Sequence, residues 1–145
     1  MRVHTRFFGD MECPREAVIR FPDGIQPFPD TDFVVISKPE DAVIYLQSTN
    51  CEGLCFIAVP VQVVEPAYFH QIPPWFLDSI GARPDQANGQ GLTSLAILTV
   101  PGEGPITANM LAPVVINPAT NKGVQAVRTD QRYSHAHPIN ECPPC

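Results

Sequence analysis

Proline is the residue that most constrains how this chain can fold, because it makes up 17 of the 145 residues. That share is more than twice the usual value of about 5%. A proline inside a helix removes an N–H donor and clashes with the preceding turn. A helical bundle is therefore disfavoured. Since 44% of the residues are hydrophobic, as in ordinary globular proteins, short strands joined by many turns are predicted instead.

Short apolar or alternating segments, separated by turn residues, predict the strands. Val3–Phe7 alternates between apolar and polar residues, as a half-buried strand does. Pro22–Ile25 has strong turn chemistry, because proline presets φ and glycine permits a positive φ. Pro60 separates two apolar runs and indicates a bend or a sheet edge there. The predicted strands cover residues 3–7, 17–21, 33–36, 43–48, 54–59, 61–64, 92–100, 106–115 and 123–128.

The best helix candidate is Pro73–Gly81, which has proline in its first positions and glycine at its end. Arg83–Gly91 is polar and predicts a loop with room for one helical turn. About nine strands with one or two short helices predict a mainly β, single-domain protein. We expect an antiparallel, closed or nearly closed β-barrel, since closure removes exposed strand edges. Residues 1–139 would form this domain, and residues 140–145 a flexible tail rich in proline and cysteine.

The charge balance argues against two classes of partner. The chain has 9 basic and 15 acidic residues, so its formal net charge is −6. It would be repelled by nucleic acid and by anionic membranes, and neither is expected as a direct partner. A basic protein is a more suitable partner, although a charge of this size also serves simply to keep a small domain soluble. Met1–Asp10 has no apolar core of signal-peptide length, and no apolar run approaches the roughly 20 residues of a membrane span, so a cytoplasmic location is expected.

Cys142 and Cys145 form a C-x-x-C pair near the C-terminus. With His135 and His137 they could supply a Cys2His2 zinc site, and by themselves they could form a redox pair. Redox use is disfavoured, because two prolines fill the gap where such a motif should begin a helix. A loose tail with reduced thiols is the plain alternative, and no cofactor is expected.

The remaining histidines, serines and cysteines form no recognisable catalytic pattern. His4 and His70 stand in no H-E-x-x-H motif, and no serine lies in a G-x-S-x-G turn. Cys55 falls in an apolar run, where a free cysteine is commonly a buried small hydrophobe. The sequence therefore favours a binding protein over an enzyme.

The segment Thr107–Asn117 combines a strand-like end with a proline in its middle. Pro113 requires a bulge or an edge strand. Asn109 can bond the broken backbone through its side-chain amide. By itself, this pattern predicts a bulged barrel strand in which the asparagines only cap turns.

The same segment, TANMLAPVVIN, resembles the T-A-N-[LM]-x-A-P-[IV]-V-I-N signature of the FliW family. Other segments resemble further family motifs in the family's order, over roughly residues 21–139. Two departures are Pro27 in place of a usual glycine and Ala136 in place of a usual arginine. The other matching segments are FPDGIQPF (21–28), LQS (46–48), LTVP (98–101), GVQAV (123–127) and YSHAHPI (133–139).

This resemblance implies a small β-barrel-like domain without known catalytic chemistry. The family binds flagellin in the cytoplasm before export, and it also binds CsrA, an RNA-binding translational repressor. A chain of this family would antagonise CsrA when flagellin has been exported, and so couple flagellin synthesis to export. The alternatives from other classes are a metal-binding or redox-responsive barrel that uses the C-terminal cysteine pair, and a barrel that binds a small ligand.

The candidate partner-binding residues are of three kinds. Aromatic residues would anchor the amphipathic helices of flagellin, and acidic residues would meet a basic partner. Residues of the proline-containing segment would shape the surface. For each of them, a role in the core or as solvated charge is the plain alternative. The predicted set is Phe21, Phe28, Tyr68 and Tyr133; Asp30, Asp32 and Glu65; and Asn109, Pro113 and Asn117.

Overall fold

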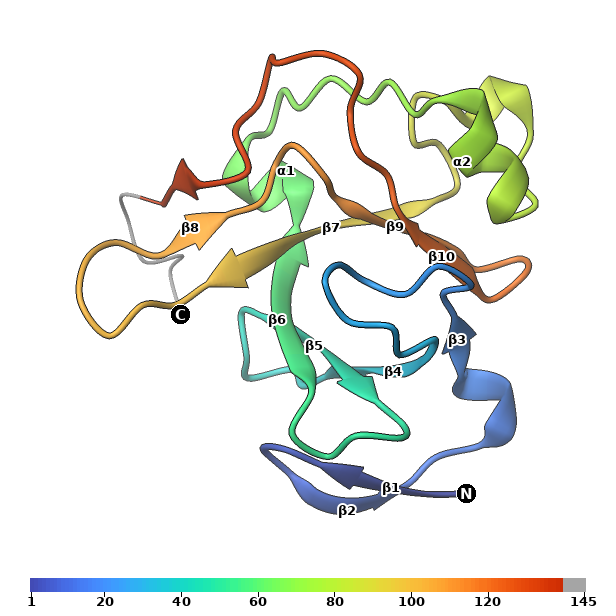
Figure 1. The fold of residues 1–145 in the computed structure, drawn as a ribbon, viewed down its shortest axis with the longest axis vertical. Helices are drawn as coiled ribbons and strands as arrows, with labels where there is room; N and C mark the ends of the chain where they lie inside the picture. The colour runs from blue at the N-terminus through green and yellow to red at the C-terminus, as the bar shows by residue number, and fades with distance from the viewer. Residues whose placement is uncertain (140–145) are drawn as a thin grey trace.

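A computed structural model describes residues 1–139, so the predicted tail with Cys142 and Cys145 lies outside the described residues. Nearly all of its regular structure is β (Figure 1). The strands are β1 (Arg2–Thr5), β2 (Gly9–Glu12), β3 (Ile19–Arg20), β4 (Asp32–Ser37), β5 (Ile44–Ser48), β6 (Cys55–Pro60), β7 (Thr93–Thr99), β8 (Thr107–Ala108), β9 (Val114–Asn117), β10 (Lys122–Gln125) and β11 (His137–Pro138). The helices are α1 (Val61–Val64) and α2 (Pro74–Ser79), with 3-10 turns at Arg15–Ala17 and Pro84–Gln86.

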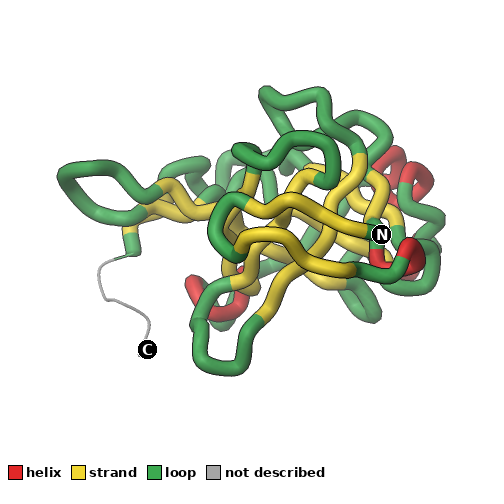
Figure 2. Tube along the Cα trace, turned by 90° about the horizontal axis from the view of Figure 1, so that it is seen from below, coloured by secondary structure: helices red, strands yellow, loops and turns green. Residues whose placement is uncertain are grey.

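Seven strands close into a barrel in the order β7-β6-β5-β4-β3-β10-β9, and β9 pairs with β7 again. The predicted mainly β, closed barrel with two short helices is confirmed. One pair departs from the antiparallel pattern, because β3 and β10 run parallel with Arg20 opposite Lys122. Beyond the barrel, β7 continues into a small extension with β8 and β11, which Figure 2 shows as an arm beside the barrel.

The first two strands form a separate hairpin, of which only β1 was predicted. The β2 sequence GDME does not alternate between apolar and polar residues and has no buried face. This strand is therefore held by its pairing with β1. Phe8 holds the hairpin on the barrel through an edge-to-face contact with Tyr45, with ring centroids 4.9 Å apart. The Arg6 main-chain N–H also donates to Gln47 Oε1 at 2.9 Å.

The prediction of a strand at Val61–Val64 is wrong, because these residues form α1. A four-residue apolar run does not distinguish a strand from a helical turn by periodicity. Pro60 ends β6 and begins this turn, since its fixed φ suits the start of a helix. The helix predicted at Pro73–Gly81 is confirmed as α2 (Pro74–Ser79), and Gly81 follows it with φ of +67°. Within residues 1–139, neither helix approaches the length and apolar character needed to cross a bilayer.

The predicted strand at 106–115 is interrupted, as its proline required. β8 ends at Ala108 and β9 begins at Val114. Asn109 bridges the break, because its Oδ1 accepts a hydrogen bond of 3.0 Å from the Ala112 N–H. The local bonding expected of Asn109 is therefore confirmed, and Pro113 lies in the gap, where no ladder bond is needed.

The barrel interior is filled by apolar side chains from every side of the sheet. Phe21 is fully buried and meets Phe33 edge-to-face at 5.5 Å. Gly123 faces the Phe21 ring so closely that a Cβ there would lie 2.4 Å from ring atoms. Further members of this cluster are Ile19, Ile25, Leu46, Leu54, Ala58, Leu95, Val114 and Ile116.

Candidate partner-binding site

Three of the predicted site residues are parts of the framework and not of the surface. Phe21 has no exposed area, so the prediction that it anchors a partner is corrected by its place in the core. Pro113 is buried in the gap before β9. Asn117 is also buried; its Nδ2 donates to the Ile80 carbonyl at 2.9 Å, and its Oδ1 accepts from the Ala119 N–H at 3.0 Å. It therefore ties the end of α2 to the β9–β10 hairpin.

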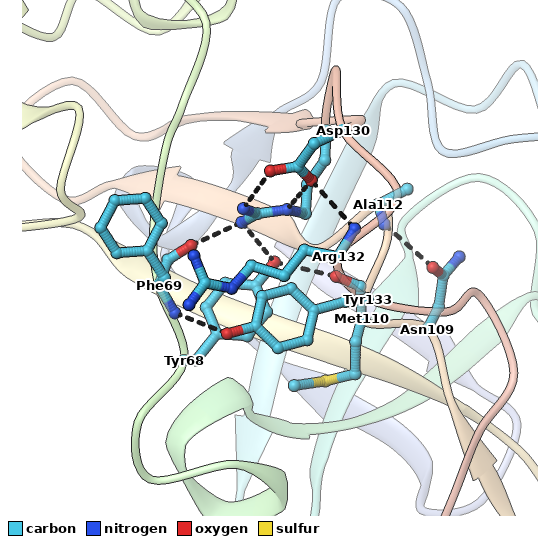
Figure 3. A network of polar contacts seen from close by, with 9 residues as sticks. Tyr68, Phe69, Asn109, Met110, Ala112, Asp130, Arg132 and Tyr133 are labelled. Carbon is cyan, nitrogen blue, oxygen red and sulfur yellow. Dashed lines mark hydrogen bonds and ion pairs between the residues drawn. The ribbon is translucent and has the colours of Figure 1, made fainter.

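Tyr68 and Tyr133, predicted separately, are brought together by the fold. Their rings stack with centroids 4.4 Å apart and an interplanar angle of 26°. Tyr68 comes from the segment between α1 and α2, and Tyr133 from the segment between β10 and β11, which run side by side (Figure 3). Tyr68 is buried and donates to the Met110 carbonyl at 2.8 Å, which attaches the pair to the segment of Asn109. We call Tyr68, Phe69, Arg128, Arg132 and Tyr133 the aromatic edge.

Arg128 is the central residue of the aromatic edge, and the sequence analysis missed it. Its guanidinium is almost fully buried. Nε and Nη2 donate to the two carboxylate oxygens of Asp130 at 2.8 and 2.9 Å. Nη1 donates to the Phe69 carbonyl at 2.6 Å. The guanidinium carbon also lies 5.3 and 4.9 Å from the ring centroids of Tyr68 and Tyr133.

These contacts keep the buried group charged. Hydrogen bonds that Arg128 donates to Asp130 raise the pKa of Arg128 above its ordinary value, although burial opposes this. In turn, the hydrogen bond from Arg128 lowers the pKa of Asp130. Burial raises the pKa of Tyr68, whose hydroxyl stays protonated and available as a donor. The only sequence signal for this pair is an arginine two residues before an aspartate, which is too common a pattern to be informative.

The aromatic edge holds Phe69 by both of its main-chain groups. The Phe69 N–H donates to the Tyr133 hydroxyl at 2.9 Å, and its carbonyl accepts from Arg128. Its side chain nevertheless points outward and is 48% exposed. The Arg132 guanidinium lies over that ring, 4.9 Å from its centroid. Within residues 1–139, Arg132 takes part in no ion pair.

Phe28 and Asp30 lie together at a second place, a groove of about 430 Å³ beside the N-terminal hairpin. We call it the hairpin groove. Phe28 is 41% exposed and meets Phe56 edge-to-face at 5.8 Å. Asp30 is partly buried, and its Oδ2 accepts from the Ser48 hydroxyl at 2.7 Å. The remaining lining residues are Arg6, Cys51, Gly53, Leu54 and Cys55.

The hairpin groove is organised by Gln47, which is fully buried. Its Oε1 accepts from the Arg6 N–H and so holds the hairpin. Its Nε2 lies 3.0 to 3.2 Å from the carbonyls of Ser48, Cys51, Glu52 and Leu54. The L-Q-S motif therefore shapes the turn that forms one wall of the groove.

The predicted acidic residues do not lie at one place. Asp30 lines the hairpin groove. Asp32 lies on β4, where its Oδ1 is 3.9 Å from Nη1 of Arg20. Glu65 belongs beside the aromatic edge, because its carbonyl accepts from the Tyr68 N–H at 3.0 Å. Its carboxylate accepts from the Ala67 N–H and closes the turn after α1.

The described part of the chain contains no cluster of three or more histidine, cysteine or acidic side chains that could hold a metal ion. The pair Cys142 and Cys145, on which the metal or redox alternative rests, lies outside that part. Cys13, Cys51 and Cys55 have free thiols. Burial raises the pKa of Cys55 to about 11, so this thiol is protonated at neutral pH and is a poor nucleophile.

Comparison with known proteins agrees with this architecture over almost the whole chain. The family model described as FliW protein matches residues 2–139. The flagellar assembly factor FliW of Bacillus subtilis strain 168 is 35% identical, with 96% of each chain covered. The FliW of Leptospira interrogans is 32% identical, over 97% of this chain and 94% of its own. A crystal structure of the flagellar assembly factor FliW superposes with a TM-score of 0.85 at 28% identity, and covers 95% of this chain and 96% of that one. The chain therefore belongs to the FliW family.

Proposed function

We propose that this protein is a cytoplasmic flagellar assembly factor that binds flagellin and antagonises the translational repressor CsrA. The observation that carries the proposal is the match to FliW over residues 2–139, in both sequence and fold. Relatives that are about one third identical over nearly their whole length are named flagellar assembly factors. The role requires partner binding and no catalysis or cofactor.

The mechanism is a switch between two binding equilibria. When flagellin accumulates, it occupies the factor, and CsrA is left free to repress flagellin synthesis. When flagellin is exported, the factor is released and binds CsrA instead. Such coupling requires only that binding of one partner lowers the affinity for the other, and the coupling free energy is the same in both directions.

The two surfaces described above supply contacts suited to these partners. The hairpin groove combines an exposed aromatic, Phe28, with the carboxylate of Asp30. The aromatic edge exposes Phe69 beside Tyr133. With a net charge of −6, long-range attraction favours a basic partner such as an RNA-binding protein.

Calorimetric titration of the purified protein with monomeric flagellin and with CsrA, both from its own organism, tests the proposal. We expect both to bind at micromolar concentration or tighter, and we expect CsrA to release its messenger RNA as the protein is added. Absence of binding to both partners would overturn the proposed function. A catalytic or small-ligand role would then have to be tested by separate experiments.

A further inference from the structure

The aromatic edge presents one side chain in a fixed and exposed position. Both main-chain groups of Phe69 are hydrogen-bonded to buried or partly buried side chains, Arg128 and Tyr133. These partners are themselves held by Asp130 and by ring stacking. Little main-chain entropy therefore remains to be lost at Phe69 when a partner binds, which makes association more favourable.

The described residues leave much of the Phe69 ring uncovered. It is 48% exposed, whereas Tyr68 next to it is buried. Covering apolar surface gains about 25 cal/mol per Å². An exposed aromatic that is rigidly held beside an arginine has the composition typical of binding hot spots.

Arg132 favours a partner with negative charge at this place. Its guanidinium stacks on Phe69, and its main-chain N–H contacts Asp130 Oδ1 at 3.4 Å. In the described part of the chain it has no ion pair, although the protein as a whole is acidic. A carboxylate on a partner would complete this site by a bidentate pair with Arg132. A basic surface would be repelled by it.

We propose that the aromatic edge binds an amphipathic helix whose apolar face covers Phe69 and whose flanking carboxylate pairs with Arg132. This inference rests on the proposed function, in which flagellin supplies amphipathic helices and CsrA is the basic partner. It assigns the aromatic edge to flagellin and leaves CsrA to other, acidic parts of the surface.

The hairpin offers a matched control of the same chemistry. Phe7 is 46% exposed, and the Arg6 guanidinium lies 5.2 Å from its ring centroid. Phe7, however, leans on the Tyr45 ring at 5.7 Å, and neither of its main-chain groups is held by a buried arginine. Arg6 lines the hairpin groove, so Phe7 alone serves as the control. The same alanine substitution at Phe7 and at Phe69 separates the effect of position from the effect of an exposed phenylalanine as such.

The test measures affinities of full-length variants for monomeric flagellin and for CsrA by calorimetry. Phe69→Ala and Arg132→Glu are each expected to weaken flagellin binding at least about tenfold, as hot-spot residues do. Arg132→Lys should retain part of the affinity, and CsrA binding should change less than about threefold. Phe7→Ala, outside both surfaces, should change neither affinity by more than that. Thermal unfolding of each variant confirms that it is folded.

The outcomes separate the two proposals. Unchanged flagellin affinity in both edge variants would overturn the inference and leave the proposed function intact. An equal loss of flagellin affinity in Phe7→Ala would also overturn it, and so would a loss confined to CsrA. If the wild-type protein binds neither partner, the proposed function itself fails, and this inference fails with it.

Discussion

The aromatic edge and the hairpin groove are both organised by one buried polar side chain, but the two side chains differ in charge. Arg128 holds the edge through an ion pair, main-chain and hydroxyl contacts, and two aromatic rings. Gln47 holds the groove through an uncharged amide that contacts only main-chain groups. Arg128 holds the main chain of the exposed Phe69 directly, whereas Gln47 shapes a turn that lines the same groove as the exposed Phe28.

The difference in charge has an energetic consequence. A buried guanidinium has lost its hydration, so each of its contacts is needed to keep the ion in place. A buried amide has lost less, and its carbonyl partners lie in a turn that solvent can partly reach. We therefore expect the edge to be the more sensitive region, both to substitution and to pH.

The largest effect is expected for Arg128→Met. This change removes the donor to the Phe69 carbonyl and leaves Asp130 without its partner. We expect a loss of about 3 kcal/mol, which comes from the unpaired Phe69 carbonyl and the lost contacts with the two tyrosine rings, because Asp130 is 39% exposed and can regain water. Urea unfolding measures the loss. Arg132→Met, at an exposed position, should change the free energy of unfolding by less than about 0.5 kcal/mol; equal losses in the two variants would contradict the central role of Arg128.

A smaller effect is expected for Gln47→Met, which keeps the side-chain volume. The Arg6 N–H and the carbonyls of the 48–54 turn lose their partner, and unpaired buried groups cost about 1–3 kcal/mol. We expect about 2 kcal/mol, together with faster proteolysis in the N-terminal hairpin. Gln62→Met at an exposed position is the control. A loss greater than that of Arg128→Met would reverse the comparison between the two regions.

Loss of the exposed aromatics should cost less still. Phe28→Ala removes one edge-to-face contact with Phe56 from a ring that is already 41% exposed. We expect a loss of about 1 kcal/mol. Phe69→Ala should fall in the same range, since its ring is similarly exposed. A loss above about 3 kcal/mol in either, measured by urea unfolding, would show that the ring belongs to the core.

The smallest effect concerns pH and involves His70, which lies next to the aromatic edge. His70 contacts the Tyr68 ring at 4.8 Å, and burial together with the charge of Arg128 lowers the pKa of His70 below 6.5. The unfolded chain therefore takes up a proton at a higher pH than the folded one. The contribution of neutral His70 to stability is complete above pH 6.5 and declines as the pH falls below that value.

Denaturation at pH 7.5 and at pH values below 6.5 measures this effect. His70→Gln, which keeps a polar group of similar length beside Gln62, should flatten the decline. The same slope in wild type and variant would assign the pH dependence to other groups. The hydrogen bond from Arg128 lowers the pKa of Asp130 below its ordinary value of 3.8, so the contribution of this carboxylate is complete above pH 3.8 and declines as the pH falls below that value.

Most of the barrel could be predicted because its strands carry local signals. The segments at 33–36, 43–48 and 54–59 are apolar runs of strand length and became β4, β5 and β6. The broken backbone at Asn109 was also predictable, since a proline inside a strand segment requires an interruption. The strand β2 was missed, because its residues have no pattern of their own and pair only through β1.

The candidate surfaces were predictable only in part. Tyr133 was predicted within a family motif and Tyr68 as an aromatic anchor, but as separate residues. Arg128 was missed because its partners Tyr68 and Phe69 are 60 and 59 residues away in the chain. Phe21 was wrongly predicted at the surface, since an aromatic residue beside a turn motif has the same local signal whether its ring lies inside or outside the barrel.

The sequence by itself determined the β class, the positions of most strands, the interruption at Pro113 and the membership in the FliW family, because each depends on local backbone chemistry or on motif order. Only the tertiary structure decided which aromatics are exposed. It also decided that a buried arginine holds the edge on which Phe69 and Arg132 lie. The physical reason is that burial and ion pairing depend on segments brought together from distant parts of the chain. No local sequence pattern indicates which distant segments come into contact.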